Sequence, residues 1–568
     1  MKKLVLLVLV ITNVLLLSAQ QGRQAAMKSI QEYTEVELSI AKNNIEIEDF
    51  TKEVSIFKVT TDSIFFCVNQ QEFDNFLRSN IPYSVLKREV LVEQPKVNTT
   101  LAYMLNSFNT YPTYEQYDTV LQVFASTYPS ISQYVNLGTL ASGRKILALH
   151  ISDNVNIAEA EPRFLYTSTM HGNETAGYIF MLKLADYLLS GYGVDSVATQ
   201  LVNSLDIWIN PLANPDGCYY GGNSSVSSAI RNNANAVNLN RNYPDPDDGP
   251  HPDGNSYQPE TNIFMALADT MHFTMSANFH GGAEVVNYPW DTWSKLPADV
   301  NWWKLVSFEY ADTARFMNGY NGYLNDFGTG VTNGYQWYTI SGGRQDYMNY
   351  FKQCREVTIE LSHTKLLPEN QLDTYWSWNK NSLLNYMKQC NYGLRGVVTD
   401  SLTGQPLSAK VFIGNHDSDS SHVYSYLPFG DYYRLLDSGY YSITYSAPGY
   451  ISQTIDSVRI DRYLSTVLNV QLRQKPDFIK SIKINKNLII VFPNPADERV
   501  NFIYHKPGME ADIRIYSSSG VLVMEQRIKG SSSVYSFNVK NLSNGIYYFT
   551  FSTSCTRQTE GGKFIIRK

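Results

Sequence analysis

The strongest constraint on the fold is a long stretch, residues 108–391, in which predicted helices alternate with short apolar strands. This alternation is typical of an α/β sheet whose strands are joined by crossover helices. Four of the strands contain or lead into polar residues: Phe164–Ser168, Leu205–Ile209, Phe273–Phe279 and Glu356–Leu361. Ligands of open α/β sheets bind beyond the carboxyl ends of the strands. The sequence therefore predicts one shared polar site at that edge.

The chain on either side of this stretch has a different pattern. Residues 1–19 contain two lysines, an apolar run and small residues at the end, which predicts a secretory signal peptide. A membrane anchor is the alternative, although the apolar run is shorter than the ~20 residues that a span needs. Residues 20–106 are polar with short apolar runs and predict a small α/β region, which is either a propeptide or a packed extra domain.

Beyond residue 391 the predicted helices give way to short strands. Residues 392–473 predict a β-sandwich, residues 474–486 a linker, and residues 487–568 a second β module. No stretch after the signal peptide is apolar and long enough to predict a membrane span. We therefore expect an exported protein of several domains.

Charge and cysteine content exclude two classes of protein. The net charge of −7 offers no basic surface for nucleic acid, and a mildly acidic surface favours cationic ligands. The cysteines are odd in number, widely spaced and free of CxxC motifs: Cys67, Cys218, Cys354, Cys390 and Cys555. They do not predict a disulfide framework, and one Cys–Cys bridge is possible but cannot be assigned.

A histidine and a glutamate follow the first of the four polar-ended strands. His171 and Glu174 are three residues apart where a loop enters a helix, so both side chains can face one point. With His280, after the third strand, they would hold a zinc ion and leave a fourth position open, as catalytic zinc sites do. His-Gly-Asn-Glu alone is equally compatible with a hydrogen-bonded turn histidine. Other motifs follow in order: Asn214-Pro215-Asp216-Gly217, Asn238-Leu239-Asn240-Arg241-Asn242-Tyr243-Pro244, His280-Gly281-Gly282, Asn287-Tyr288-Pro289-Trp290-Asp291 and Tyr338-Thr339-Ile340-Ser341-Gly342-Gly343.

These motifs, in this order, resemble those of zinc metallocarboxypeptidases of the carboxypeptidase A, B and E type, in the N/E or regulatory subfamily. The resemblance covers residues 107–391 and implies a catalytic domain with a doubly wound mixed α/β sheet. Residues 392–473, which begin Gly393-Leu394-Arg395-Gly396, resemble that subfamily's transthyretin-like β-sandwich. Among secreted bacterial proteins the chain is most similar to Lys/Arg-specific carboxypeptidases of Bacteroidetes. The implied reaction releases one residue, Lys or Arg, from a peptide C-terminus.

The resemblance implies catalytic roles for five residues. His171, Glu174 and His280 would be the zinc ligands. Glu360, in the fourth strand, would act as general base and acid, taking a proton from water and returning it to the leaving amine. Arg231 would polarise the scissile carbonyl. The structural alternatives are a solvated surface arginine at position 231 and a buried glutamate with an unseen partner at position 360.

Five more residues match substrate-binding positions. Asn240 and Arg241 match the pair that holds the terminal carboxylate, which an internal peptide bond lacks. Tyr338 matches a mobile capping tyrosine, with simple packing as the alternative. Asp291 and Gln345 match positions that line a pocket for basic side chains.

Two features leave alternatives open. Arg344 stands where relatives commonly carry methionine; pointing inward it would neutralise Asp291 and repel basic substrates, whereas pointing outward it would change little. The acidic loop, residues 245–254, could bind calcium through its oxygens or lie solvated at the surface.

The last 80 or so residues carry a second resemblance. The motifs are Phe492-Pro493-Asn494-Pro495, Ile515-Tyr516-Ser517-Ser518-Ser519-Gly520, Gly545-Ile546-Tyr547-Tyr548-Phe549 and Lys563-Phe564-Ile565-Ile566-Arg567-Lys568. Together they resemble the Ig-like sorting domain read by the type IX secretion machinery of Bacteroidetes. This implies export across both membranes, with release or attachment at the cell surface.

Three functions follow as hypotheses. The favoured one is an active secreted metallocarboxypeptidase that trims peptides, for instance after trypsin-like proteases expose Lys or Arg ends. The second is a non-catalytic peptide-binding protein or adhesin on the same scaffold, which the filled metal, catalytic and clamp positions disfavour. The third is an amidase acting on peptidoglycan stem peptides, which Asp291 and the transthyretin-like region disfavour.

Overall fold

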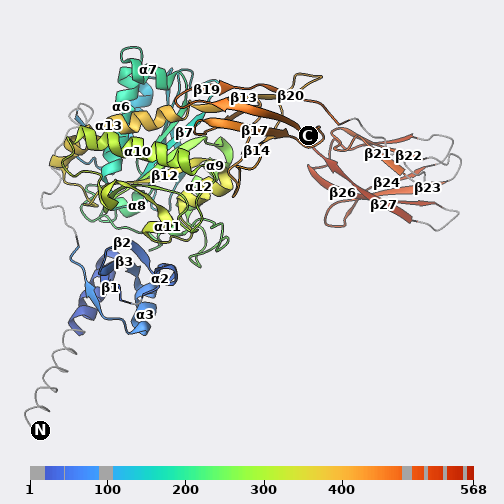
Figure 1. Cartoon of the computed structure of the whole chain (residues 1–568). Coiled ribbons are helices and arrows are strands. Elements are labelled where there is room, and N and C mark those ends of the chain that lie inside the picture. The colour runs from blue at the N-terminus through green and yellow to red at the C-terminus, as the bar shows by residue number, and fades with distance from the viewer. Residues whose placement is uncertain are drawn as a thin grey trace, which may run out of the picture. The chain divides into compact units, whose positions relative to one another are not determined.

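The computed structural model describes residues 20–43, 45–88, 107–475, 489–504, 510–528, 534–553 and 559–568 (Figure 1). The chain forms two compact units, residues 1–474 and residues 475–568. The predicted signal peptide and most of the predicted linker lie outside the described residues. Within the described ranges, every helix is too short or too polar to cross a membrane.

A small antiparallel sheet begins the first unit. Its strands, in the order β2-β3-β1-β4, are β1 (Glu35–Ala41), β2 (Ser55–Val59), β3 (Ser63–Asn69) and β4 (Tyr83–Val85). Two helices, α2 (Ile47–Glu53) and α3 (Gln70–Phe76), accompany it. Asn69 and Glu72 form a reciprocal capping box that fixes the start of α3. Phe66 packs edge-on against Phe50 and Phe76, so the sheet has a core of its own.

An eight-stranded mixed sheet forms the centre of this unit, in the order β11-β10-β12-β9-β7-β8-β6-β5. The strands are β5 (Ser132–Thr139), β6 (Lys145–Ile151), β7 (Arg163–Ser168), β8 (Asp206–Asn210), β9 (Met275–His280), β10 (Ala283–Tyr288), β11 (Val331–Asn333) and β12 (Arg355–Ser362). The adjacent strands β8, β7, β9 and β12 run parallel. They are the four polar-ended strands of the sequence, so their carboxyl ends meet at one edge, as predicted.

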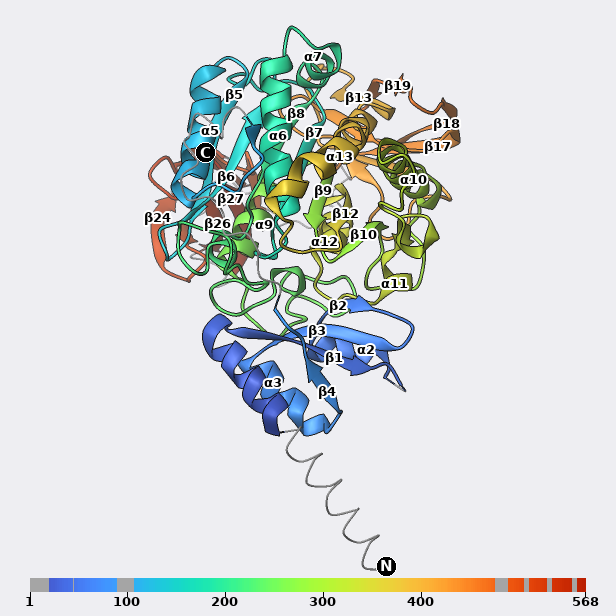
Figure 2. The same cartoon turned by 90° about the vertical axis from the view of Figure 1, so that its left-hand side faces the viewer.

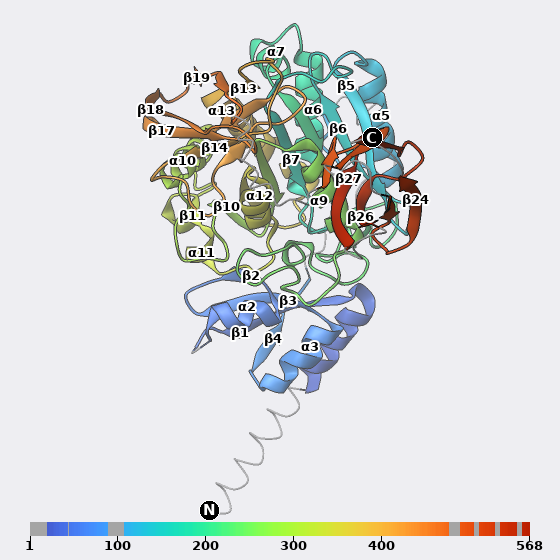
Figure 3. The same ribbon diagram turned by 90° about the vertical axis from the view of Figure 1, so that its right-hand side faces the viewer.

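Helices cover both faces of this sheet (Figures 2 and 3). One core contains residues of α5 (Tyr114–Thr127), α6 (Ala176–Gly191), α7 (Ser196–Val202), α10 (Val300–Met317) and α13 (Glu369–Gln389). The other contains residues of α9 (Pro259–Met271) and α12 (Arg344–Lys352). Strand β6 links the two, because Leu147 and Leu149 pack in the first core while Ile146 and Ala148 pack in the second. The two-faced burial explains why these strands are almost continuously apolar.

Two small sheets complete the first unit. One has the order β16-β13-β19, with β20 also on β13, and the other has the order β15-β14-β17-β18. The strands are β13 (Gly393–Asp400), β14 (Lys410–Ile413), β15 (Val423–Tyr424), β16 (Asp431–Arg434), β17 (Gly439–Ser446), β18 (Gln453–Ile460), β19 (Ser465–Val467) and β20 (Val470–Leu472). Buried Asp299, just before α10, joins them to the large sheet through ion pairs with Arg355 and Arg434. The region is β-rich as expected, and its transthyretin-like assignment stays a prediction.

The second unit is also made of β-strands. Its sheets have the orders β21-β22-β25 and β24-β23-β26-β27. The strands are β21 (Ile489–Phe492), β22 (Arg499–Tyr504), β23 (Ala511–Tyr516), β24 (Leu522–Ile528), β25 (Val534–Asn538), β26 (Gly545–Thr553) and β27 (Thr559–Ile566). Phe502 contacts Phe537, Phe549 and Phe564, so the two sheets share one core. The Ig-like assignment stays a prediction.

Candidate functional site

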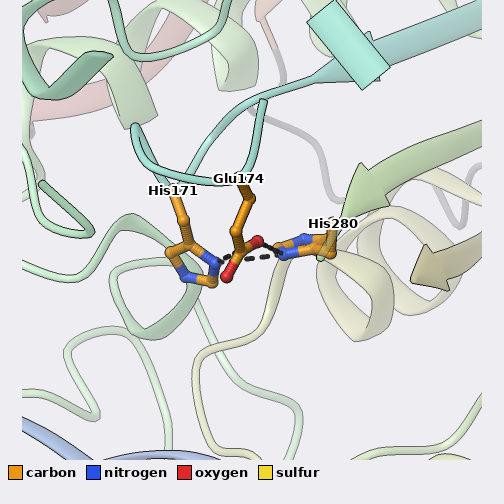
Figure 4. Close-up of side chains that lie close together, drawn as sticks. All are labelled: His171, Glu174 and His280. Atoms are coloured by element: carbon orange, nitrogen blue, oxygen red, sulfur yellow. Dashed lines mark hydrogen bonds and ion pairs between the residues drawn. The ribbon is translucent and has the colours of Figure 1, made fainter. Parts of the chain in front are cut away.

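Three buried side chains converge beyond the carboxyl ends of β7 and β9 (Figure 4). The Nδ1 atoms of His171 and His280 lie 3.0 Å apart, and Oε2 of Glu174 lies 2.9 Å and 2.8 Å from them, respectively. Each side chain offers one ligand atom to a common point. Two imidazole nitrogens and one carboxylate oxygen form a donor set that suits zinc. The structure thus brings together the three residues predicted as ligands.

The local backbone explains how two ligands come from one short loop. β7 ends at Ser168, and the next residues turn sharply before α6 begins at Ala176. Gly172 is required in this turn, because a Cβ at that position would lie 2.3 Å from the backbone carbon of Gly217. The turn brings Nδ1 of His171 to 2.9 Å from Oε2 of Glu174.

Neighbouring polar groups fix the histidine and glutamate. Arg231 Nη1 donates to Oε1 of Glu174 at 2.7 Å, which leaves Oε2 facing the histidines. Nε2 of His171 lies 3.0 Å from Oδ1 of Asn238. Burial, reinforced by the charge of Arg231, lowers the pKa of His171 to about 3. The ring is therefore neutral at pH 7, which a metal ligand requires.

Glu360 lies next to this cluster because β12 pairs with β9. The parallel register places Glu360 opposite His280. The side chain is 8% exposed, and among the described residues its Oε2 has no hydrogen-bond partner. Burial, followed by the charge of Glu174, raises the pKa of Glu360 well above its usual value. Glu360 thus has a free carboxyl oxygen beside the predicted metal ligands, as a proton-transfer group needs.

Asn240 and Arg241 occupy a buried one-turn helix, η2 (Leu239–Arg241). Arg241 Nη1 donates to the carbonyl of Asn240 at 2.8 Å, and its Nη2 donates to the carbonyl of Ile56 at 3.2 Å. Burial lowers the pKa of Arg241 to about 10, so the guanidinium remains charged at pH 7. Tyr338, at the end of α11 (Gly334–Trp337), is buried and packs in the core of the N-terminal sheet.

Asp291 and Gln345 contact each other, as a common pocket requires. Oδ1 of Asp291 accepts hydrogen bonds from Nε2 of Gln345 at 3.0 Å and from Nδ2 of Asn287 at 2.9 Å. Burial raises the pKa of Asp291 to about 6. A Cβ at Gly334 would lie 1.8 Å from the same oxygen, so only glycine fits against this carboxylate.

Arg344 pairs with groups other than Asp291, although the sequence left open whether it would neutralise that carboxylate. Its side chain is fully buried and donates to Oε2 of Glu356 at 3.1 Å and to Oγ1 of Thr167. Its backbone N–H donates to Oδ1 of Asn240 at 2.9 Å. Because the guanidinium is paired with Glu356, it does not neutralise the Asp291 carboxylate.

The N-terminal sheet contacts Arg231 and Arg241. The Glu35 carboxylate accepts hydrogen bonds from the backbone N–H groups of Arg231 at 2.7 Å and Asn232 at 3.0 Å. Ser55 Oγ accepts from Nε of Arg231 at 3.2 Å, and the next residue, Ile56, contacts Arg241. Glu35 and Ser55 belong to no motif, so sequence patterns give no signal for them.

Two further predicted features, the acidic loop and the cysteines, do not belong to the His171 cluster. In the acidic loop, Asp245 accepts hydrogen bonds from Gly342 N at 2.9 Å and Thr292 Oγ1 at 3.1 Å. In the described part of the chain, the side-chain groups that could hold a metal are the His171 cluster and an acidic trio at positions 153, 159 and 161, so calcium in this loop stays a prediction. Four cysteines are buried and unpaired, and Cys555 lies outside the described residues.

Comparison with known proteins gives two matches to protein-family models. Residues 117–382 match the model described as zinc carboxypeptidase, and residues 490–567 match a secretion system C-terminal sorting domain. The sorting-domain match falls on the second unit.

Individual proteins are also similar to this chain. Carboxypeptidase D of Mus musculus is 38% identical over 344 residues, covering 58% of this chain and 24% of that protein, so the chain spans about a quarter of that relative. The catalytic chain of human carboxypeptidase N is 33% identical, covering 61% of this chain and 82% of that protein. The crystal structure of thrombin activatable fibrinolysis inhibitor has a TM-score of 0.50 at 18% identity, covering 63% of this chain and 99% of that chain. This last likeness supports the carboxypeptidase α/β fold.

Proposed function

Because the chain belongs to the zinc carboxypeptidase family, we propose that it is an exported enzyme that removes single Lys or Arg residues from peptide C-termini. The observation that carries this proposal is the convergence of five groups at one sheet edge. A two-histidine, one-glutamate cluster lies beside a glutamate with a free oxygen, and an arginine contacts the cluster. This arrangement supports hydrolysis more directly than passive peptide binding, which needs neither metal ligands nor a proton-transfer group.

Each residue then has a defined task. A zinc ion held by His171, Glu174 and His280 would supply Lewis-acid chemistry and lower the pKa of a bound water. Glu360 accepts a proton from the attacking water at its free oxygen and passes it to the leaving amine. Arg231, positioned by its contact with Glu174, donates hydrogen bonds to the oxygen on which negative charge develops.

Substrate binding follows from the charged groups in the cleft. Arg241, with Asn240, holds the terminal carboxylate of the peptide, and its remaining positive charge at pH 7 supports this role. Tyr338 covers the bound residue. Asp291, with Gln345 beside it, receives a Lys or Arg side chain through a charge-assisted hydrogen bond. The pairing of the buried Arg344 with Glu356 supports this preference, because it leaves the Asp291 charge available.

The deciding experiment is digestion of matched peptides that differ only in a C-terminal Arg, Lys, Phe or Asp, followed by mass spectrometry. We expect loss of one residue from the Arg and Lys peptides, none after zinc chelation, and none with Glu360→Gln. Trimming of the Phe peptide instead would support carboxypeptidase activity but contradict the proposal that Asp291 lines a pocket for basic side chains. A folded, zinc-loaded protein that trims nothing would favour the non-catalytic hypothesis.

We also propose that the N-terminal sheet is an inhibitory propeptide rather than a passive extra domain. Strand β2 supports this, because Ser55 contacts Arg231 and the Ile56 carbonyl contacts Arg241, the groups assigned to the substrate. Cleavage of the chain between residues 89 and 106 should raise kcat/KM on a Lys-ending peptide, with Glu360→Gln treated identically as the control. If the intact chain is as active as the cleaved chain, the region is an ordinary structural domain.

Export rests on the sorting-domain match of residues 490–567. We propose that the type IX machinery of a Bacteroidetes-like host reads this unit and that a signal peptide directs the first membrane crossing. Expression in a type IX-competent host should place the enzyme outside the cell, whereas deletion of residues 487–568 should retain it in the periplasm. Equal secretion of both forms would contradict this route.

A further inference from the structure

The loop that carries Asp291 is held by a second carboxylate, that of Asp346. Oδ1 and Oδ2 of Asp346 accept hydrogen bonds from the backbone N–H of Asp291 at 3.1 Å and 3.0 Å. Oδ2 also accepts from the backbone N–H of Thr292 at 2.8 Å. Asp346 is fully buried in the first turn of α12. A buried carboxylate is costly unless it is hydrogen-bonded, and here its main partners are the main-chain groups of the pocket loop.

The neighbouring residue holds the same aspartate from the other side. Gln345 donates from Nε2 to Oδ1 of Asp291 at 3.0 Å, while its own Oε1 accepts from the backbone N–H of Thr358 in β12 at 2.7 Å. Gln345 therefore hydrogen-bonds to the side chain of Asp291, and Asp346 hydrogen-bonds to its backbone N–H. Both residues belong to the first turn of α12, which packs against β12, the strand that carries Glu360.

We propose that Asp346 is a positioning residue for specificity: by anchoring the Asp291 main chain to α12, it aims the Asp291 carboxylate at the basic side chain of the substrate. This inference rests on the proposed Lys/Arg preference and adds to it a residue that does not itself touch the substrate. Asp346 acts as a hydrogen-bond acceptor. Burial, followed by the charge of Asp291, raises its pKa well above the usual value, which fits a role that does not depend on its charge.

The acceptor role can be separated from charge by two substitutions. Asp346→Asn retains one oxygen, and the Oδ2 position alone accepts from both N–H groups, at 3.0 Å and 2.8 Å. Asp346→Ala removes both acceptors and leaves the two N–H groups unpaired. We expect Asp346→Ala to raise KM for an Arg-ending peptide about tenfold or more, since a displacement of ~1 Å in a binding group has effects of this size. Its kcat, and its kcat/KM on a Phe-ending peptide, should change less than about threefold.

Asp346→Asn should keep KM for the Arg-ending peptide within about threefold of the unchanged protein, because it preserves the acceptor. Asp299→Asn is the matched control for loss of a buried carboxylate: Asp299 joins the β-rich region to the large sheet and lies outside the cleft machinery. It should lower the melting temperature without changing the KM ratio of Arg-ending to Phe-ending peptides. If the alanine variant does not fold, Asp346→Ser, whose hydroxyl is too short to reach both N–H groups, takes its place with the same expected KM shift.

Three results would overturn the inference. They are an unchanged KM in folded Asp346→Ala, an equal loss on Arg-ending and Phe-ending peptides, and a KM increase in Asp346→Asn as large as in Asp346→Ala. The last would assign the effect to charge instead of position. Failure of the proposed function is distinguishable, because in that case the unsubstituted protein would already fail to trim Arg-ending or Lys-ending peptides.

Discussion

The candidate site has two ends whose charges are balanced in different ways. The metal end is the cluster of His171, Glu174 and His280 with its neighbours Arg231 and Glu360, and the pocket end is Asp291 with Gln345. At the metal end, Arg231 is ion-paired with Glu174, and His171 is neutral at pH 7. At the pocket end, Asp291 accepts hydrogen bonds from two neutral amides, and no cation of the described residues forms an ion pair with it. Under the proposed function, this difference means that the catalytic groups are arranged before substrate arrives, whereas the Asp291 charge would be paired only by the basic side chain of the substrate.

Removal of the metal is the largest test of the metal end. Dialysis against a zinc chelator should abolish peptide trimming, a loss of more than about 10³-fold, because the bound zinc ion would be the group that lowers the pKa of the attacking water. The melting temperature should also fall, since a bound metal stabilises the folded state by mass action. Peptide-release assays and thermal melts before and after addition of zinc measure both effects. Full activity in a verified metal-free protein would show that His171, Glu174 and His280 do not hold a metal that the reaction needs.

Glu360→Gln tests the same end with the metal retained. The amide cannot accept the proton, so kcat should fall by about 10²- to 10⁴-fold while KM changes little. Steady-state kinetics on an Arg-ending peptide, with zinc content measured alongside, separates this effect from metal loss. A kcat within about tenfold of the unsubstituted enzyme would assign proton transfer to another group.

The convergence of the three predicted ligands could be predicted from sequence, because it depends on a short spacing and on strand ends, whereas their role as zinc ligands stays a prediction from the family resemblance. His171 and Glu174 lie three residues apart in one turn, and His280 could be identified because it is the polar residue that ends an apolar strand. The support of the pocket could not be predicted in this way. The direction of Arg344 depends on Glu356, which lies on another element, and the N–H groups held by Asp346 are main-chain atoms with no sequence signature.

The fold shows the same division. The four central strands were predicted because burial on both faces makes them apolar. Strand β10 (Ala283–Tyr288) was not predicted, and only its last two residues belong to a motif, the one that ends at Asp291. Likewise, the contacts of the N-terminal sheet with Arg231 and Arg241 join residues that are 176 and 185 positions apart, a separation that local sequence patterns do not bridge.

Asp291→Asn tests the pocket end and should have a smaller effect. The substitution keeps the size of the side chain but removes the charge, and a hydrogen bond to a charged group is worth about 1.5–3 kcal/mol. KM for Lys-ending and Arg-ending peptides should therefore rise about 10- to 100-fold with little change in kcat. Phe-ending peptides, assayed in parallel, should be unaffected or slightly improved. Loss of kcat on all peptides would mean that the two ends are not separable.

The pH dependence of KM is the finest test, because it titrates the pocket without a substitution. Arg241 and Asp245 are the charged groups that act on Asp291, whose pKa is raised to about 6, chiefly by burial. Above that pH the carboxylate is ionised and attracts a basic side chain; as the pH falls through 6 it is protonated and the attraction is lost. KM for an Arg-ending peptide should thus rise about tenfold from pH 7 to pH 5. KM for a Phe-ending peptide should stay flat, and Asp291→Asn should remove the Arg-specific slope. A parallel rise for both peptides would place the titrating group at the metal end or in the carboxylate clamp instead.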